Sequence, residues 1–192
     1  MTIYGWLIFP LWLTLVAYWV LAARGVKRSI GSRWLWWREI AIRLGLFALV
    51  VLTVRIAAAA HALPNARLYA LNTSGLLGLI GFVFSVLGIG LAILARAHLG
   101  RNWGLPMSRK ENPELVMTGP YAFVRHPIYG GMLLAMLGSA IGQSLFWVLP
   151  LIVYGPYFIL SARREEQNLV EQFGDGYRAY MTRTKMLLPF VL

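Results

Sequence analysis

Four side chains that could do chemistry stand close to the two ends of one uncharged stretch of the sequence. His126 and Tyr129 lie at its start, and Glu165 and Glu166 follow its end. No Asp, Glu, Lys or Arg occurs from 126 to 162, which is too long for one span of about 20 residues. This stretch is predicted to fold back as a tight helical hairpin, which returns its exit to its entrance. The sequence therefore predicts an imidazole, a phenol and two carboxylates together at the boundary between water and lipid.

Such a cluster suits a reaction between a polar cofactor and a lipophilic acceptor, but each residue also has a structural interpretation. His126 and Pro127 are compatible with the mere start of a helix, because proline is favoured at the first helical position. Glu165 and Glu166 are compatible with a solvated helix face, paired with a basic neighbour at 163 or 164. The sequence alone leaves both interpretations open.

Metal chemistry and nucleotide folds of the soluble kind are not expected. The chain has no cysteine, which excludes disulfides, thiolate catalysis and Cys-based zinc sites. Its histidines, His61, His98 and His126, are spread over the chain and give no credible set of three metal ligands. A dinucleotide-binding fold opens a helix with a glycine-rich turn after a strand, and no strand is predicted here.

The elements that must position the cluster are apolar helices. Of the 192 residues, 59% are hydrophobic and 13% are charged, whereas soluble domains carry about 25% charged residues. We predict an all-α, polytopic integral membrane protein, a single domain over 1–192 that contains the hairpin near its C-terminus. Five transmembrane helices are predicted, at about 3–23, 40–60, 75–95, 128–142 and 145–160, with a kink at Pro150 or Pro156.

Details inside and after the spans carry further expectations. Glycines recur in the third span, at 75, 78, 81, 88 and 90, and small residues favour close packing of membrane helices. Arg43 and Arg55 lie near the ends of the second span, where long basic side chains snorkel to the interface. The charged segment 163–185 is too polar to span, and Gly174–Gly176 is predicted to separate two surface helices.

The net charge of +11 is concentrated beside the apolar runs. Nearly all Lys and Arg occur in the loops 24–38 and 96–125 and in the tail from 163, whereas the loop 61–74 holds one. Cytosolic loops carry the excess of basic residues. We therefore expect a multi-pass protein of a bacterial inner membrane, with its N-terminus outside and its C-terminus in the cytosol. Its partners are expected to be membrane lipids and a lipophilic substrate, with no nucleic acid; the oligomeric state is left open.

Two longer motifs resemble a known family. ELVMTGPYAFVRHPIYGGML begins at Glu114, and EEQNLVEQFGDGYRAYM begins at Glu165, after the hairpin. This order of Arg-His-Pro-x-Tyr, hairpin, Glu-Glu pair and Phe-Gly-x-x-Tyr-x-x-Tyr resembles the integral-membrane methyltransferases of the isoprenylcysteine carboxyl methyltransferase family and their bacterial phospholipid-methyltransferase-like relatives. LGRNWG at 99–104 resembles the family's lead-in. The resemblance covers about 98–182 and implies a catalytic part at about 98–185.

The resemblance implies S-adenosylmethionine as methyl donor, in a cytosolic pocket over the last two helices. It implies that the cofactor runs along the backbone at 113–116, packs on Tyr121, bonds to His126 and Tyr129 through its amino-acid end, and bonds to Glu165 through another polar group. The implied cofactor-binding residues are Pro113, Glu114, Leu115, Val116, Tyr121, His126, Pro127, Ile128, Tyr129 and Glu165, and the candidate catalytic residues are Arg163, Arg164 and Glu166.

The methyl acceptor is left open among an isoprenylcysteine carboxylate, a phospholipid amine and a small thiol. A carboxylate is already ionised at pH 7, whereas an amine or thiol must lose a proton to a base such as Glu166, Tyr129 or His126. Members of the family that methylate prenylcysteine generally carry an Arg about one helical turn before the first Glu, and this chain has Ser161 there. A carboxylate in a partly desolvated site needs a fixed cation. Ser161 therefore favours a neutral or cationic acceptor.

Two other classes of function compete with a methyltransferase. An NADPH-dependent membrane reductase related to the sterol C14 enzymes resembles this family around His-Pro-x-Tyr, but those proteins have more helices than this short chain. A non-enzymatic membrane protein, such as a small transporter or an assembly factor, is expected to place ionisable residues at the midplane of several spans. None of the five apolar runs carries a charge near its centre.

Overall fold

The computed structural model describes residues 3–23, 29–30, 33–59, 75–103, 109–110, 114–143 and 145–188. Its α-helices are α1 Ile3–Ala22, α2 Arg33–Ala59, α4 Gly75–Leu99, α5 Pro127–Gly142, α6 Val148–Phe173 and α7 Asp175–Arg183. Short 3-10 helices are η2 Gly100–Asn102, η3 Gly119–Ala122 and η4 Leu145–Trp147, and the strands β1 Ser29–Ile30 and β2 Arg109–Lys110 pair antiparallel. Apart from these two-residue strands, the described chain is helical, as predicted.

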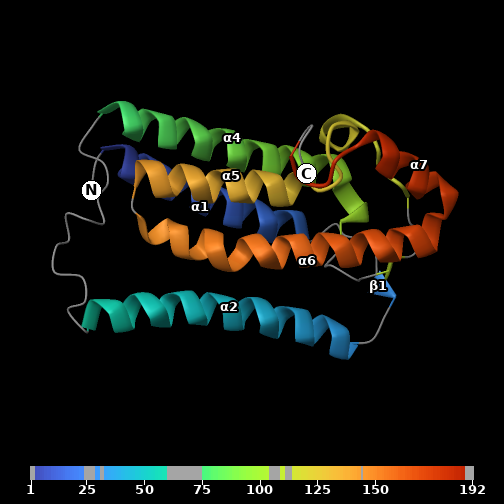
Figure 1. The fold of residues 1–192 in the computed structure, drawn as a ribbon, viewed down its shortest axis with the longest axis horizontal. Helices are drawn as coiled ribbons and strands as arrows, with labels where there is room; N and C mark the ends of the chain where they lie inside the picture. The colour runs from blue at the N-terminus through green and yellow to red at the C-terminus, as the bar shows by residue number, and fades with distance from the viewer. Residues whose placement is uncertain are drawn as a thin grey trace.

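The long helices lie along one common axis, with α4 at one edge of the molecule and α2 at the other (Figure 1). Helices α1, α4 and α6 run in one direction, whereas α2 and α5 run in the opposite direction (Figure 1). Each long helix therefore carries the chain from one end of the bundle to the other. The short helix α7 lies at the end where α6 finishes and α5 begins.

Three helical stretches are long and apolar enough to cross a membrane, namely Ile3–Ala22, Gly75–Asn102 and Leu145–Phe173. Pro127–Gly142 and Ile40–Thr53 are shorter apolar helices. The predicted spans thus correspond to three long apolar helices and two shorter ones in the part of the chain that the structure describes. Their outward side chains are large and apolar; Trp6, for example, is 65% exposed, which suits a surrounding of lipid rather than water.

Two helices differ from the predicted bounds. The second begins at Arg33 rather than near 40, and α6 continues to Phe173 rather than ending near 160. Residues 161–173 are mostly Ala, Arg, Glu, Gln and Leu, which favour helix whether or not lipid surrounds them. The break comes at Gly174, as predicted: its φ of 55° lies in the left-handed region, which glycine adopts at low cost.

Helices α4 and α5 approach so closely that their backbones touch. A Cβ built on Gly81 would lie 2.3 Å from the backbone nitrogen of Gly142, and one built on Gly88 would lie 2.4 Å from that of Ala135. The predicted role of glycines in close packing is confirmed at these two positions. Gly90, on the same helix, has nothing within 4 Å of its Cβ position, so its glycine is not explained by packing.

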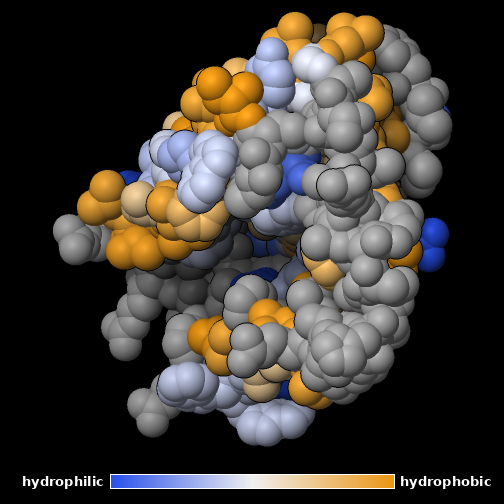
Figure 2. Space-filling model, turned by 90° about the vertical axis from the view of Figure 1, so that its left-hand side faces the viewer, coloured by the Kyte–Doolittle hydropathy of each residue, from blue (hydrophilic) through white to orange (hydrophobic). Residues whose placement is uncertain are grey.

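Helix α2 is attached differently, through polar contacts with α6. Arg43 donates from Nε to the Tyr157 hydroxyl over 2.8 Å, and the Tyr154 hydroxyl donates to the Arg43 carbonyl over 3.4 Å. Viewed along the bundle, the molecule is hollowed between α2 and the other helices (Figure 2). Arg43 is thus held by a neighbouring helix, a contact that the prediction of a snorkelling side chain did not include. The side chain of Arg55 lies outside the described residues.

Candidate active site

The candidate site forms at the end of the bundle where α5 begins, where α6 extends beyond its apolar part, and where α7 folds back (Figure 1). The extra turns of α6 carry Glu165 and Glu166 to this end. The chain 184–188 then passes beside the start of α5, since the backbone N–H groups of Arg125 and His126 donate to the carbonyls of Lys185 and Met186, each over 2.9 Å. Segments far apart in sequence therefore share one site.

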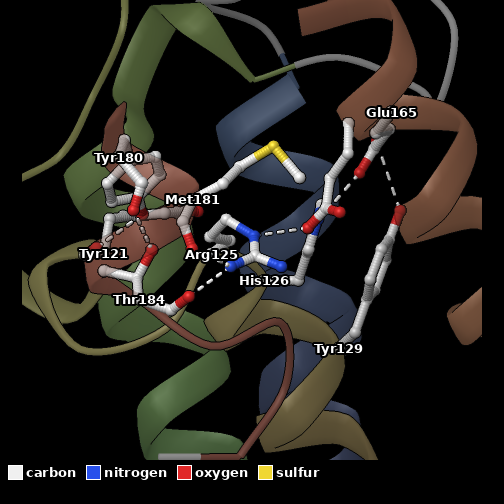
Figure 3. A network of polar contacts seen from close by, with 9 residues as sticks. Tyr121, Arg125, His126, Tyr129, Glu165, Tyr180, Met181 and Thr184 are labelled. Atoms are coloured by element: carbon white, nitrogen blue, oxygen red, sulfur yellow. Dashed lines mark hydrogen bonds and ion pairs between the residues drawn. The ribbon is translucent and has the colours of Figure 1, made fainter. Parts of the chain in front are cut away.

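Arg125 joins three of these segments. Its Nε donates to Oε1 of Glu166 over 2.5 Å, and its Nη1 donates to the carbonyls of Met181, over 3.3 Å, and Thr184 (Figure 3). The side chains of Arg125 and Glu166 are each 10% exposed, so this pair is largely withdrawn from solvent. Arg125 thereby fastens the start of α5 to α6 and to the end of α7.

His126 lies between the two carboxylates. Its Nδ1 is 3.3 Å from Oε2 of Glu165, and its Nε2 is 3.3 Å from Oε1 of Glu166. Burial lowers the pKa of His126, but the hydrogen bond and charge of Glu165 and the adjacent Glu166 outweigh it and raise the pKa above its ordinary value. Nε2 is fully buried, and its contact with Glu166 is an ion pair without hydrogen-bond geometry. It remains a buried polar atom without a hydrogen-bond partner among the described residues.

Tyr129 completes the cluster one turn into α5. Its hydroxyl donates to Oε1 of Glu165 over 3.3 Å. Its ring stacks between His126, at 5.6 Å between centroids, and Phe158 of α6, at 4.9 Å, with interplanar angles of 9°. The predicted meeting of His126, Tyr129, Glu165 and Glu166 is therefore present, and Figure 3 shows the labelled members converging from α5 and α6.

The Phe-Gly-x-x-Tyr-x-x-Tyr motif closes one side of the site. After the turn at Gly174, α7 brings the Tyr180 hydroxyl to the carbonyl of Tyr121 over 2.5 Å (Figure 3). Tyr177 is 1% exposed and packs edge to face on Tyr180. Burial raises the pKa of Tyr180 to about 12, so this hydroxyl stays protonated and keeps donating. The motif holds the segment before α5 in place.

Asn102, in the segment that follows α4, and His98 at the end of α4 contact the chain on the other side of the site. His98 Nε2 lies 2.8 Å from the Thr118 hydroxyl, and the amide nitrogen of Asn102 donates to Oε2 of Glu114 over 3.1 Å. The Asn102 amide oxygen is buried and has no hydrogen-bond partner in the described part of the chain. Gly119, with φ of 61°, lets the turn η3 lie against the His98 ring. The segment that begins at Glu114 is thus held by two side-chain contacts, at Glu114 and at Thr118.

The remaining implied cofactor residues lie beside the cluster or outside the description. Leu115 and Val116 are half-buried in irregular chain, and Tyr121 is buried in η3. Pro127 is buried as the first residue of α5, and Ile128 follows it half-buried. Pro113 lies outside the described residues. His126 and Pro127 do begin a helix. The structural interpretation and the place of His126 in the cluster are therefore compatible.

Two candidate catalytic residues are not brought into the cluster. Arg163 and Arg164 are exposed on α6, whereas Glu166, the third candidate, is buried against Arg125 and His126. Ser161 is buried on the same helix. Within the described residues no group of three potential metal ligands occurs. Sequence reasoning gave no role to Arg125; its place beside His126 in the motif was the available signal.

Comparisons with known proteins identify the family of this chain. The family model described as phospholipid methyltransferase matches residues 76–176, more than half of the chain. Protein-S-isoprenylcysteine O-methyltransferase of Schizosaccharomyces pombe is 32% identical over 127 residues, covering 59% of this chain and 54% of that protein. Methanethiol S-methyltransferase 1 of Bradyrhizobium diazoefficiens is 38% identical over 73 residues, covering 36% of this chain and 24% of that protein.

A solved structure shows the same fold. The eukaryotic intramembrane Ras methyltransferase ICMT superposes with a TM-score of 0.56 at 23% identity, covering 76% of this chain and 52% of that one. The chain thus spans about half the length, or less, of these relatives. The matched segment 76–176 contains α4, α5, α6 and the polar cluster between them. On the extent of that match, this chain belongs to the phospholipid methyltransferase family of integral membrane proteins.

Proposed function

We propose that this protein is an S-adenosylmethionine-dependent methyltransferase that acts on a lipophilic acceptor at the cytosolic face of the membrane. The observation that carries the proposal is the His126 ring. It is buried between Glu165 and Glu166 with one nitrogen lacking a hydrogen-bond partner, at the end of the bundle where water and lipid meet. Buried polar groups are normally hydrogen-bonded, so this nitrogen, whose contact with Glu166 is an ion pair without hydrogen-bond geometry, suits the approach of a polar ligand.

The residues present fit the zwitterionic end of such a cofactor. The His126 imidazole, whose pKa the two carboxylates raise, and the Tyr129 hydroxyl would face its carboxylate, and Glu165 would face a cationic group. The buried amide oxygen of Asn102 offers a further acceptor on the opposite side. The chain from Glu114 would supply backbone groups along the ligand, because it forms no helix or strand of its own up to η3.

The cofactor would supply an electrophilic methyl group on a sulfonium. The chain would contribute alignment of the nucleophile with that methyl group and exclusion of water. The Tyr180 contact to Tyr121 and the Arg125 contacts to the end of α7 would serve both, because they hold walls of the site rigid. Glu166 is engaged by Arg125 and His126, which suits a positioning role, whereas Glu165 is 23% exposed and better placed to take a proton.

Three classes of methyl acceptor are compatible with the proposed reaction. The relatives described above are an isoprenylcysteine O-methyltransferase and a methanethiol S-methyltransferase, and the family is described as phospholipid methyltransferase. Our proposal therefore includes an isoprenylcysteine carboxylate, a phospholipid amine and a small thiol. The alternating direction of the long helices supports five spans, and the excess of Lys and Arg in the segments 24–38, 96–125 and 163–185 supports an N-terminus outside and a site in the cytosol.

Binding of S-adenosylhomocysteine to the detergent-purified protein tests the proposal. We expect calorimetry to detect binding, and His126→Ala, Tyr129→Phe and Glu165→Gln each to weaken it by about 0.5–3 kcal/mol, the range for one hydrogen bond to a polar or charged group. NADPH should not bind. Absence of S-adenosylhomocysteine binding by the wild type, or stabilisation by NADPH instead, would overturn the proposal in favour of the reductase.

A further inference from the structure

Arg43 is a cation within the apolar part of a helix. It lies near the start of the apolar stretch Ile40–Thr53 of α2. Ionisable side chains inside membrane helices are costly and rare, and they commonly mark a substrate or ion site. In this chain the cost is reduced by α6, whose Tyr157 hydroxyl accepts from Arg43 Nε over 2.8 Å.

Within the described part of the chain, most of the hydrogen-bonding capacity of Arg43 is not used. A guanidinium presents five N–H donors, and Tyr157 takes the one on Nε. The two terminal amino groups have no hydrogen-bond partner among the described residues, and no described carboxylate lies within ion-pair distance of them. Four donors and a positive charge are therefore available in a half-buried position.

A continuous aromatic path links Arg43 to the candidate active site. Tyr154 and Tyr157, which hold Arg43, each contact Phe158, with 5.8 Å between ring centroids. Phe158 stacks on Tyr129, whose hydroxyl reaches Glu165. The cation therefore belongs to the surroundings of the site.

The order of these groups along the bundle is informative. Tyr157 precedes Glu165 by two helical turns of α6, about 12 Å at 1.5 Å per residue, and α6 runs toward the site end (Figure 1). Arg43 therefore lies on the membrane side of Glu165. Both α2 and α6 expose large apolar side chains, such as Leu44 and Ile152.

We propose that Arg43 binds the phosphodiester of an amine-bearing lipid and thereby selects the acceptor of the proposed methyl transfer, on which this inference rests. A phospholipid has its amine outermost, its phosphate next and its acyl chains deepest. The site has Tyr129 and Glu165 outermost, Arg43 next and apolar helix surface beyond. A guanidinium is suited to phosphate because its N–H groups match two oxygens at once.

In the reaction the lipid nitrogen forms the new carbon–nitrogen bond with the methyl group. The carbon–sulfur bond of the donor breaks and its electron pair stays on sulfur, while the proton released by the nitrogen passes to Glu165 and then to water. A prenylcysteine would use this arrangement poorly, because its carboxylate is itself the nucleophile and would lie at the level of Glu165. This chain thus has Ser161 where prenylcysteine methyltransferases generally carry an Arg, and it has a cation at a different place, Arg43 on α2.

The test compares two acceptors that differ in the phosphate. Wild type, Arg43→Gln and Arg43→Lys are assayed in detergent micelles with labelled S-adenosylmethionine and either phosphatidylethanolamine or stearylamine. We expect Arg43→Gln to raise the KM for phosphatidylethanolamine at least tenfold, with a smaller change in kcat, and Arg43→Lys to raise it less. The KM for stearylamine should not change. Arg178→Gln, which removes an exposed charge on α7, is the control and should match the wild type.

Calorimetry with S-adenosylhomocysteine separates this inference from the proposed function. Unchanged donor affinity in Arg43→Gln, together with the raised KM, supports the inference. An unchanged KM, or an equal rise for both amines, overturns it and leaves the function standing. A wild type that binds the donor product but methylates only farnesylcysteine or methanethiol also overturns it. A wild type that binds no S-adenosylhomocysteine overturns the function as well.

Discussion

Helices α4 and α2 are both long and apolar, yet they join the bundle in opposite ways. Helix α4 meets α5 backbone to backbone at Gly81 and Gly88, with no room for a methyl group. Helix α2 meets α6 through Arg43 and two tyrosine hydroxyls. Close packing of small residues gives rigid membrane interfaces, whereas isolated hydrogen bonds between such helices contribute little. The interface of α4 with α5 is therefore expected to be the more rigid one, and α2 to be the more weakly held helix.

The largest expected effect lies on the rigid side, at Arg125. Arg125→Gln would leave Glu166 buried with only His126 to balance its charge. Losing one partner of a buried ion pair costs about 3–5 kcal/mol. Denaturant unfolding in micelles should show this loss of unfolding free energy. Arg178→Gln, whose pairing with Asp175 at 3.8 Å is exposed, is the matched control and should show no measurable change. Equal midpoints for both variants would contradict the assigned role of Arg125.

The charge of His126 is expected to make the stability of the folded protein depend on pH. Its pKa is raised above 6.5 in the folded protein, so its contribution to stability is fully present below 6.5 and is lost as the pH rises through the raised pKa. We expect the free energy of unfolding of the wild type, measured by denaturant unfolding, to exceed that of His126→Gln by about 1.5–3 kcal/mol at pH 5.5, which is the range for hydrogen bonds to charged groups. The difference should shrink at alkaline pH. A difference that grows with pH would show that His126 is neutral when folded.

The backbone contact of α4 is tested by two glycines two residues apart. Gly88→Ala should lower the free energy of unfolding by about 1–3 kcal/mol, the usual cost of overpacking, because the methyl group would lie 2.4 Å from the Ala135 nitrogen. Gly90→Ala has free space around it and should cause no loss. Thermal unfolding of both variants beside the wild type gives the comparison. A similar fall for both would mean that helix flexibility, not packing, decides.

The smallest effect is expected where α2 attaches. Tyr154→Phe removes a hydrogen bond of 3.4 Å to the Arg43 carbonyl and should cost less than about 1 kcal/mol. Tyr180→Phe removes a bond of 2.5 Å and leaves the Tyr121 carbonyl buried without it, so about 1–3 kcal/mol is expected. If Tyr154→Phe proves the costlier of the two, α2 is as rigidly held as α4.

The helices and the cluster followed from the sequence because both depend on local rules. An uncharged stretch twice the length of a span must turn back, and this placed His126 opposite Glu165. The full extent of α6 was missed because the predicted end followed hydropathy, whereas the helix ends only where backbone geometry changes at Gly174. Hydropathy marks where lipid ends and does not mark where hydrogen bonding along the helix ends.

Partnerships between helices were the part that could not be predicted. Arg43 was predicted to snorkel to the membrane interface because it lies near the end of its own apolar run. That position gives no information on the contact with Tyr157, which belongs to another helix. Arg163 and Arg164 are exposed on α6 and lie outside the cluster, because successive residues of a helix point in different directions; their catalytic role stays a prediction. Arg125 pairs with Glu166 and also donates to carbonyl groups of Met181 and Thr184; its place in the motif pointed to the residue, but backbone carbonyl partners cannot be identified from sequence.

The chain after α7 has a consequence for how the protein is made. The carbonyls of Thr184, Lys185 and Met186 complete the contacts of Arg125 and His126. These residues follow α5 and α6 in the chain, so their contacts with Arg125 and His126 can form only after both helices have been synthesised. A chain truncated before Thr184 would keep α5 and α6 and yet lack the carbonyl groups that hold the start of α5.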